Sequence, residues 1–122
     1  MSEQKNDNYE SLSYREKIIF LAGVFEGEGS MGNWSGGGYK DRYFRIVIKM
    51  TDLDIVERFK NFFKVGNIGF VKKYKGHHKQ AFEWKVNGKQ AIDVMLQLSP
   101  YLGIRRQEKF KICFQHYKLL HL

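Results

Sequence analysis

Residues 21 to 29 read Leu-Ala-Gly-Val-Phe-Glu-Gly-Glu-Gly, and this stretch decides how the rest of the chain can be interpreted. It closes an apolar run that begins after Ser13, where Ser13 and Glu16 have the spacing of a helix capping box. Apolar residues from Ile18 to Phe25 fill nearly the whole circumference of this predicted helix, which indicates burial on more than one side. Gly29 is a natural stop for it.

Two glycines of this helix, Gly23 and Gly27, lie four residues apart and therefore on one face. Glycine in a helix interior costs about 1 kcal/mol relative to alanine, which makes sense where a second helix approaches closely. The chain holds one copy of the segment, so the second helix would come from another copy of the chain, related by a two-fold axis. Fraying of the helix end near Gly27 stays open as the alternative. We expect Phe20, Gly23 and Gly27 to form a homodimer interface.

Glu28 lies at the C-terminal end of the helix, where the helix dipole disfavours an anion by about 0.3–1 kcal/mol. The partner's Glu28 would lie close by across the axis and add like-charge repulsion. A divalent cation resolves this conflict, so we predict Mg²⁺, with Mn²⁺ as a substitute, bound by Glu28 and the Gly27 carbonyl. A solvated helix-end acid is the alternative. Glu26 points elsewhere and is predicted to be structural, hydrogen-bonded near the subunit interface.

Beyond this helix, the apolar periodicity alternates between strands and helices. An irregular strand and turn is predicted over 32–38, strands over 43–50, 68–74 and 81–86, and helices over 55–63, 91–98 and 110–117. In the strand 43–50, one face carries Phe44, Ile46, Ile48 and Met50, and the other Tyr43, Arg45, Val47 and Lys49. The order α-β-β-α-β-β-α-α predicts one α+β domain over 13–122, with helices on one face of a four-stranded, mostly antiparallel sheet. Residues 1–12 are predicted to be a flexible tail.

The composition of the 122 residues is globular and basic, with 21 Lys and Arg against 13 Asp and Glu and a net charge of +8. Such a surplus suggests a polyanionic partner, although a merely soluble basic domain stays open. The single cysteine, Cys113, excludes an internal disulfide and fits a reducing compartment, such as the cytoplasm or a mitochondrial or chloroplast matrix. No apolar run approaches the roughly 20 residues that span a bilayer. The polar stretch 1–13 lacks the features of a signal or transit peptide.

The segment 21–29, followed by Ser30, resembles the signature of the LAGLIDADG homing endonucleases, in its Glu-Gly-Glu-Gly variant. The predicted order of elements resembles that of the family over nearly the whole chain. The resemblance implies a homodimeric endonuclease for intron homing that makes metal-dependent double-strand breaks in a long, near-palindromic DNA site. It implies that Glu28 is catalytic and that cleavage leaves 3′-hydroxyl and 5′-phosphate ends. An RNA-splicing maturase and a DNA-binding regulator without cleavage stay open as alternatives.

Two further positions match the family only in part. Relatives carry a polar residue that positions water after the second strand, and Asp52 matches it, although a plain helix cap is equally possible. Relatives also place a Lys shortly after a Leu-x-Pro-x-Leu segment, and here residues 98–102 are followed by Arg105. Arg105 can stabilise charge on a phosphate, but it is a poor proton shuttle because it is always protonated. Its role therefore stays open.

The outward strand residues are predicted to form a basic and aromatic DNA-binding surface. A two-stranded ribbon fits the major groove, where Arg and Lys pair with guanine and Gln with adenine. The choice between Lys72 and Lys73 is open, and the lysines at 73, 75 and 79 would contact phosphates or water. His77 and His78 are expected at a hairpin tip rather than at a metal. The predicted DNA-binding residues are Ser30, Trp34, Tyr43, Arg45, Lys49, Lys72, Tyr74, Gln80, Glu83 and Lys85.

Overall fold

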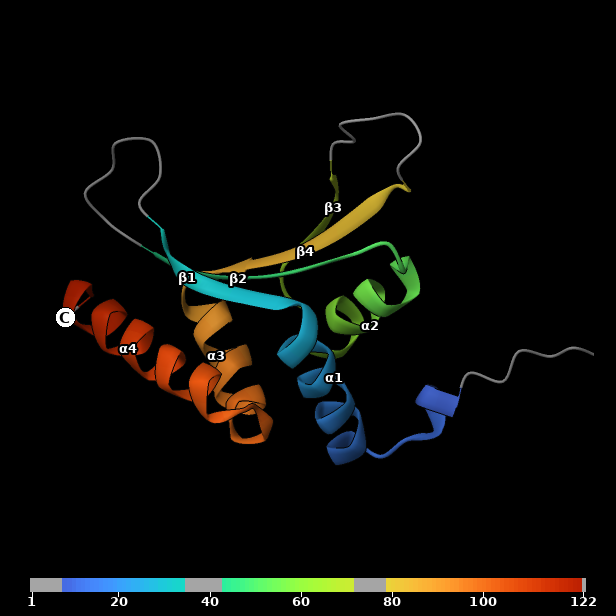
Figure 1. The fold of residues 1–122 in the computed structure, drawn as a ribbon, viewed down its shortest axis with the longest axis horizontal. Helices are drawn as coiled ribbons and strands as arrows, with labels where there is room; N and C mark the ends of the chain where they lie inside the picture. The colour runs from blue at the N-terminus through green and yellow to red at the C-terminus, as the bar shows by residue number, and fades with distance from the viewer. Residues whose placement is uncertain (1–7, 35–42, 72–78, 122) are drawn as a thin grey trace, which may run out of the picture.

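The structure of the protein, a computed structural model, describes residues 8–34, 43–71 and 79–121. The predicted order α-β-β-α-β-β-α-α is confirmed, with two short 3-10 helices in addition (Figure 1). The elements are η1 (Asn8–Ser11), α1 (Tyr14–Glu28), β1 (Gly29–Trp34), β2 (Tyr43–Met50), α2 (Leu53–Phe63), β3 (Asn67–Val71), β4 (Ala81–Asn87), α3 (Gly88–Leu98), η2 (Ser99–Tyr101) and α4 (Ile104–Leu120).

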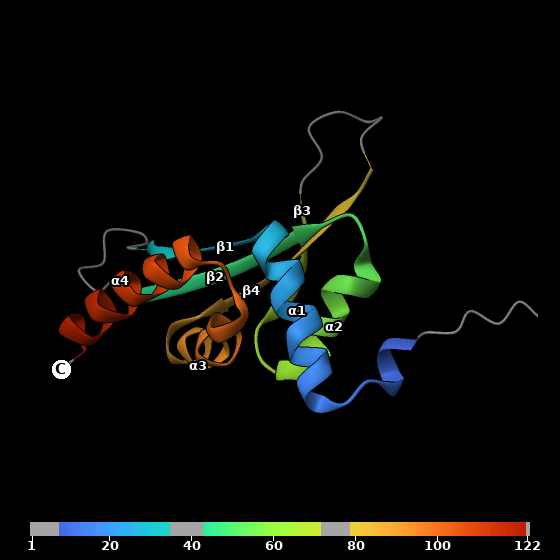
Figure 2. The same cartoon turned by 60° about the horizontal axis from the view of Figure 1, so that its bottom comes forward.

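The four strands form one sheet in the order β1-β2-β4-β3, and every neighbouring pair is antiparallel. Figures 1 and 2 show the α-helices on one side of this sheet. None of the described helices covers the other side. The prediction of a half-buried antiparallel sheet in an α+β fold is therefore confirmed.

The core lies between the sheet and the helices, and the strand alternation predicted from the sequence places its side chains. Phe44, Ile46 and Ile48 of β2 are fully buried, whereas Lys49 is exposed. Trp84 of β4 is also fully buried, and its indole Nε1 donates a hydrogen bond of 2.8 Å to the Val65 carbonyl. This bond satisfies the one polar group that the indole carries into the core.

The first helix begins and ends where the sequence predicts. Ser13 and Glu16 form both hydrogen bonds of the capping box, at 3.1 and 2.8 Å. Gly29 follows the last helical residue, and a Cβ placed on it would lie 2.5 Å from the ring of Phe25. Because real Cβ atoms do not approach carbons so closely, the fully buried Phe25 restricts this position to glycine.

The N-terminal tail predicted over residues 1–12 requires a correction. Asn8–Ser11 form η1, and the buried Tyr9 packs its ring 5.5 Å from that of Phe20. The guanidinium carbon of Arg58 lies 4.4 Å from the centre of the Tyr9 ring. Aromatic and cation–π contacts therefore hold this segment on α1 and α2. Residues 1–7 lie outside the described part of the chain.

The last helix carries its predicted apolar face. Phe110 and Cys113 are buried, and Phe114 and Tyr117 pack against the core with them. Burial raises the pKa of the Cys113 thiol, and the nearby Lys109 ammonium lowers it by less. The thiol therefore stays neutral, as a core residue. Among the described residues, the helices are too short or too polar to cross a membrane.

Candidate active site

Glu28 lies where α1 ends and the sheet begins. Its side chain is exposed, and no hydrogen bond or ion pair engages it within the described part of the chain. Two surface hollows meet at Glu28. The first, here called the sheet hollow, has a volume of about 280 Å³ and opens on the outer face of the sheet. It is lined by Glu28, Ser30, Arg45, Val47, Lys49, Glu83 and Lys85.

The second hollow, here called the strand-end hollow, has a volume of about 400 Å³ and follows the end of β2. It is lined by Glu28, Lys49, Met50, Thr51, Asp52 and Ala81. Two of the predicted catalytic residues, Glu28 and Asp52, therefore line one concavity. Asp52 occupies the N-cap position of α2, but its side chain makes no capping hydrogen bond. Its exposed carboxylate is thus left for the hollow, and a plain capping role has no support.

The structure does not bring Arg105 to this place. Arg105 is exposed in the first turn of α4 and lines neither of the hollows that Glu28 lines. Its neighbour Arg106 is the residue that reaches back toward the end of α1. The guanidinium of Arg106 donates a hydrogen bond of 2.8 Å to the Gly29 carbonyl.

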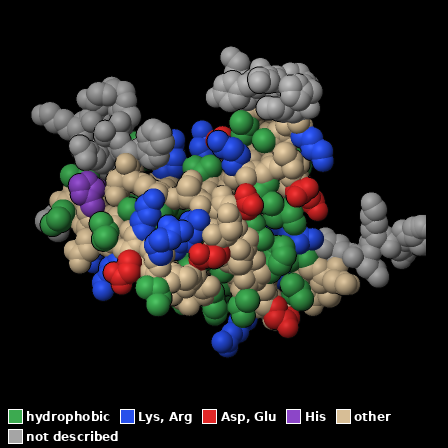
Figure 3. Space-filling view, viewed as in Figure 1, with side chains coloured by type: hydrophobic (Ala, Val, Ile, Leu, Met, Phe, Trp, Pro, Cys, Tyr) green, Lys and Arg blue, Asp and Glu red, His purple; other side chains and the backbone are tan. Residues whose placement is uncertain are grey.

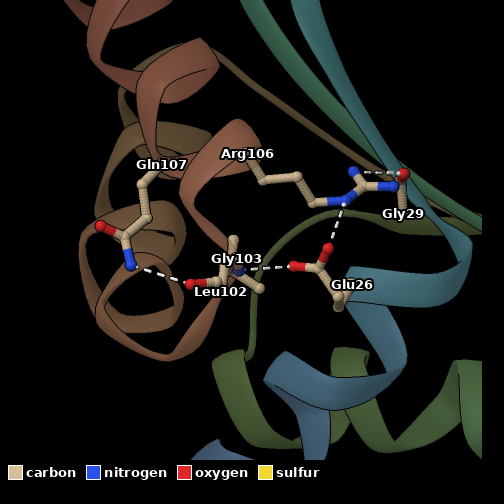
Figure 4. Close-up of polar contacts among 6 residues, drawn as sticks. All are labelled: Glu26, Gly29, Leu102, Gly103, Arg106 and Gln107. Carbon is tan, nitrogen blue, oxygen red and sulfur yellow. Dashed lines mark hydrogen bonds and ion pairs between the residues drawn. The ribbon is translucent and has the colours of Figure 1, made fainter.

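Arg106 and Glu26 together join α1 to the start of α4, as Figure 4 shows. One carboxylate oxygen of Glu26 accepts a 2.8 Å hydrogen bond from the Gly103 backbone N–H, and the other lies 3.5 Å from Nε of Arg106. The Arg106 side chain is 14% exposed, so its charge is largely removed from water. We call Glu26, Gly29, Gly103 and Arg106 the α1–α4 brace. The predicted structural role of Glu26 agrees with these contacts.

We expect Arg106→Met to lower the free energy of unfolding by about 1–2 kcal/mol, because the hydrogen bond from the charged guanidinium to the Gly29 carbonyl is lost. Thermal or urea unfolding measures this loss. Lys111→Met, on an exposed position of the same helix, is the matched control and should unfold as the wild type does. Equal stability of the two variants would contradict a stabilising brace.

The outer face of the sheet carries six of the predicted DNA-binding residues. The register places Ser30 of β1 opposite Val47 of β2, and Val47 opposite Lys85 of β4. Lys85 and Glu83 form an ion pair of 3.4 Å. In Figure 3, some Lys and Arg side chains lie at the upper, sheet side of the molecule, and others lie in the middle of the view and at its lower edge. The six are Ser30, Tyr43, Arg45, Lys49, Glu83 and Lys85.

Arg45 is fixed in place by neighbours on this face. Its Nε donates a 2.8 Å hydrogen bond to the side-chain oxygen of Asn87, and Nη2 donates one of 3.2 Å to the Tyr43 hydroxyl. The sequence does not predict Asn87 as a site residue, because Asn87-Gly88 has the pattern of a strand end. The cross-strand pairing of residues 45 and 87 identifies it only once the register is known.

Four predicted DNA-binding residues remain, namely Trp34, Lys72, Tyr74 and Gln80. The side-chain amide of Gln80 donates hydrogen bonds of 2.8 and 2.9 Å to the carbonyls of Val71 and Ala81, so it closes its own hairpin. This engagement argues against the predicted adenine contact. Trp34 belongs to β1, where its backbone pairs with Tyr43. Lys72, Tyr74, the other lysines and the histidines of 72–78 lie outside the described residues.

The face of α1 that holds the predicted interface glycines is uncovered. Gly23 and Gly27 are exposed, and a Cβ on either would meet nothing within 4 Å. Ile19, one turn before Gly23, is 45% exposed. The helix continues through Gly27 to Glu28, so fraying does not explain the glycines. Phe20, in contrast, is partly covered by the chain's own Tyr9.

Comparison with known proteins finds likeness in structure and not in sequence. No protein-family model and no curated protein sequence matches the chain. The homing endonuclease I-CvuI, in complex with its target, aligns with a TM-score of 0.69 at 20% identity, over 88% of this chain and 69% of that chain. The archaeal intron-encoded homing endonuclease I-Vdi141I, complexed with DNA, aligns with a TM-score of 0.66 at 15% identity, over 87% and 69%.

A longer protein of the same kind matches as well. The LAGLIDADG homing endonuclease I-GzeII, in complex with its DNA target, aligns with a TM-score of 0.63 at 15% identity. The alignment covers 98% of this chain but only 38% of that one. The fold is therefore found both in chains somewhat longer than this one and as a part of a much longer chain.

Proposed function

Because the chain has the fold of the LAGLIDADG homing endonucleases, we propose that it is a site-specific DNA endonuclease that works as a homodimer. The observation that carries this proposal is the position of Glu28. An exposed carboxylate lies at the rim of a basic strand surface, and a second carboxylate, Asp52, lines the same hollow. Basic strands bind the phosphate backbone and the base edges, and the carboxylates serve the hydrolysis of the phosphodiester.

The donor set at Glu28 suits a hard divalent cation such as Mg²⁺. Glu28 offers a carboxylate that no other described group engages, and the Gly27 carbonyl belongs to the open end of the same helix. Within the described part of one chain, His, Cys, Asp and Glu do not gather in groups of three or more. The partner subunit's Glu28 and DNA phosphates complete the oxygen ligands in this proposal. The ion, when bound, supplies Lewis acidity and an activated water.

The uncovered glycine face of α1 supports the homodimer. Each of Gly23 and Gly27 destabilises the helix by about 1 kcal/mol relative to alanine. No described neighbour lies close enough to require glycine at either position. A second α1 packed across this face gives the two glycines a purpose, because it brings helix backbones close. It also brings the Glu28 residues of two subunits toward one axis, as cleavage of both DNA strands requires.

Asp52 is proposed to orient the attacking water. It follows β2, whose outward side chains face the DNA surface, and it shares the strand-end hollow with Glu28. A carboxylate in this position accepts a hydrogen bond from water and holds it in line with a phosphate. Arg105 is left without a proposed catalytic role in this arrangement.

The experiment that tests the function is cleavage of a randomised duplex-DNA library by the wild-type protein in Mg²⁺, followed by sequencing of the cut ends. The proposal expects enrichment of one long, near-palindromic site, cut in both strands to leave 3′-hydroxyl and 5′-phosphate ends. Binding of duplex DNA without cleavage would instead support a regulator. Preference for a structured intron RNA over duplex DNA at physiological salt would support a maturase.

A further inference from the structure

Of the residues that the structure describes, Lys49 and Glu28 are the two that line both the sheet hollow and the strand-end hollow. The strand register explains why they meet. Gly29 of β1 pairs with Ile48 of the antiparallel strand β2. Glu28, the residue before Gly29, therefore lies beside Lys49, the residue after Ile48. Lys49 points outward from β2 and is exposed. Its ammonium therefore belongs to the neighbourhood of Glu28 and not only to the DNA-reading surface.

Among the described residues, Lys49 is the one cation that lines the strand-end hollow. Glu28 and Asp52 bring negative charge to it, Met50, Thr51 and Ala81 bring none, and Lys49 brings the positive charge. The other cations nearby are placed differently. Arg45 and Lys85 line the sheet hollow alone, and Arg105 lines neither.

Glu83, the acid opposite Lys49 on the neighbouring strand, does not form an ion pair with the Lys49 ammonium. Glu83 is the cross-strand neighbour of Lys49, but its ion pair runs to Lys85 at 3.4 Å. Within the described residues, Lys49 makes no hydrogen bond or ion pair. A lysine ammonium on a flexible stem, without such a partner, can follow a ligand into either hollow.

We propose that Lys49 is a catalytic residue that contacts the scissile phosphate, and not the base-reading residue that the strand pattern suggests. This inference rests on the proposed endonuclease function. During hydrolysis, the water oxygen bonds to phosphorus, the bond from phosphorus to O3′ breaks, and its electron pair leaves with O3′, which takes up a proton. Negative charge builds on the phosphate oxygens, and an ammonium placed there stabilises it.

The two roles of Lys49 predict different results, and Lys49→Met separates them. A catalytic Lys49 contributes to every target sequence, so its removal slows cleavage without changing which site is selected. A base-reading Lys49 contributes at one base pair in each half-site, so its removal changes the preferred base there. On the newly preferred site, the rate would then return to that of the wild type.

The measurement is single-turnover cleavage of the site that the wild type selects, at saturating protein, together with library selection by Lys49→Met. We expect the rate to fall by about 10- to 100-fold, the selected sequence to stay the same, and Lys49→Arg to recover part of the loss. Lys89→Met is the matched control, because Lys89 lies on α3, and its side chain is 80% exposed. Thermal unfolding verifies that each variant is folded.

The inference is overturned by a Lys49→Met protein that cuts as fast as the wild type, on the original site or on one with a changed base. A wild-type protein that cuts no member of the library overturns the proposed function, and this inference with it. A wild type that cuts, with a variant that cuts equally well, overturns the inference alone.

Discussion

Replacing Glu28 with Gln is expected to lower the cleavage rate by about 10³-fold or more while duplex-DNA binding persists. The amide has almost the same shape as the carboxylate, but it is neutral and a much weaker ligand for Mg²⁺. Glu28 is exposed at the end of α1, so the folded structure should tolerate the change. Without Mg²⁺, the variant should bind DNA at least as tightly as the wild type, because one repulsion between carboxylate and phosphate is gone.

Single-turnover cleavage across a series of Mg²⁺ concentrations measures this effect, with binding measured separately in a gel-shift assay. Glu57→Gln is the matched control, since Glu57 is an exposed acid of α2 that lines neither hollow at Glu28. It should cut as the wild type does. A Glu28→Gln protein that retains more than about a tenth of the wild-type rate would remove Glu28 from the centre of the mechanism.

The second large effect is expected at the glycine face of α1, where Gly23→Leu should raise the dissociation constant of the dimer by about 10- to 100-fold. The estimate follows from the cost of overpacking, about 1–3 kcal/mol. Within one subunit the leucine meets open space, since a Cβ on Gly23 has no atom within 4 Å. The variant should therefore fold as a monomer and lose double-strand cleavage. Sedimentation or light scattering over a concentration series measures the association.

The variant Gly23→Ala distinguishes a helix α1 with a helical partner from one without, because the two cases predict different effects of the added methyl group. If α1 has no helical partner, Gly23→Ala should raise the free energy of unfolding by up to about 1 kcal/mol, because alanine favours the helix. If a second helix packs there, the added methyl groups oppose association, and the variant should dissociate more readily than the wild type. Gln90→Leu, at an exposed position of α3, is the control for adding an apolar side chain to a helix surface. It should leave association unchanged.

Local rules were enough to predict much of the fold. The capping box at Ser13 and the stop at Gly29 depend on residues only a few positions apart, and both are confirmed. The alternation over 43–50 determines which side chains of β2 enter the core, whatever the strand order is. Such features need no knowledge of distant segments, so the sequence alone contains them.

The parts of the site that the sequence did not predict depend on which distant segments meet. The Arg106 guanidinium is hydrogen-bonded to the Gly29 carbonyl. The sequence of residues 98–106 alone does not show that Arg106, and not Arg105, makes this contact, because the contact depends on how α4 packs beside β1. Likewise, β2 presents Arg45 and Lys49 in the same alternating pattern, and only the pairing of Gly29 with Ile48 shows that Lys49 lies beside Glu28. The Gln80 amide has the chemistry of a base contact, yet its own hairpin carbonyls occupy it.

The strict alternation of β2 and β4 has a consequence for how such a protein can change over time. Most inward residues are buried and pack against one another, whereas the outward residues contact mainly water and each other. Substitutions on the outer face therefore leave the free energy of unfolding nearly unchanged. If this face binds DNA as proposed, the preference for a DNA sequence can drift, or be redesigned, one strand position at a time. By contrast, residues 23–29 of α1 and β1 contribute to the core and to the brace, and in the proposed function also to the dimer and the metal site, so we expect selection to leave them little freedom.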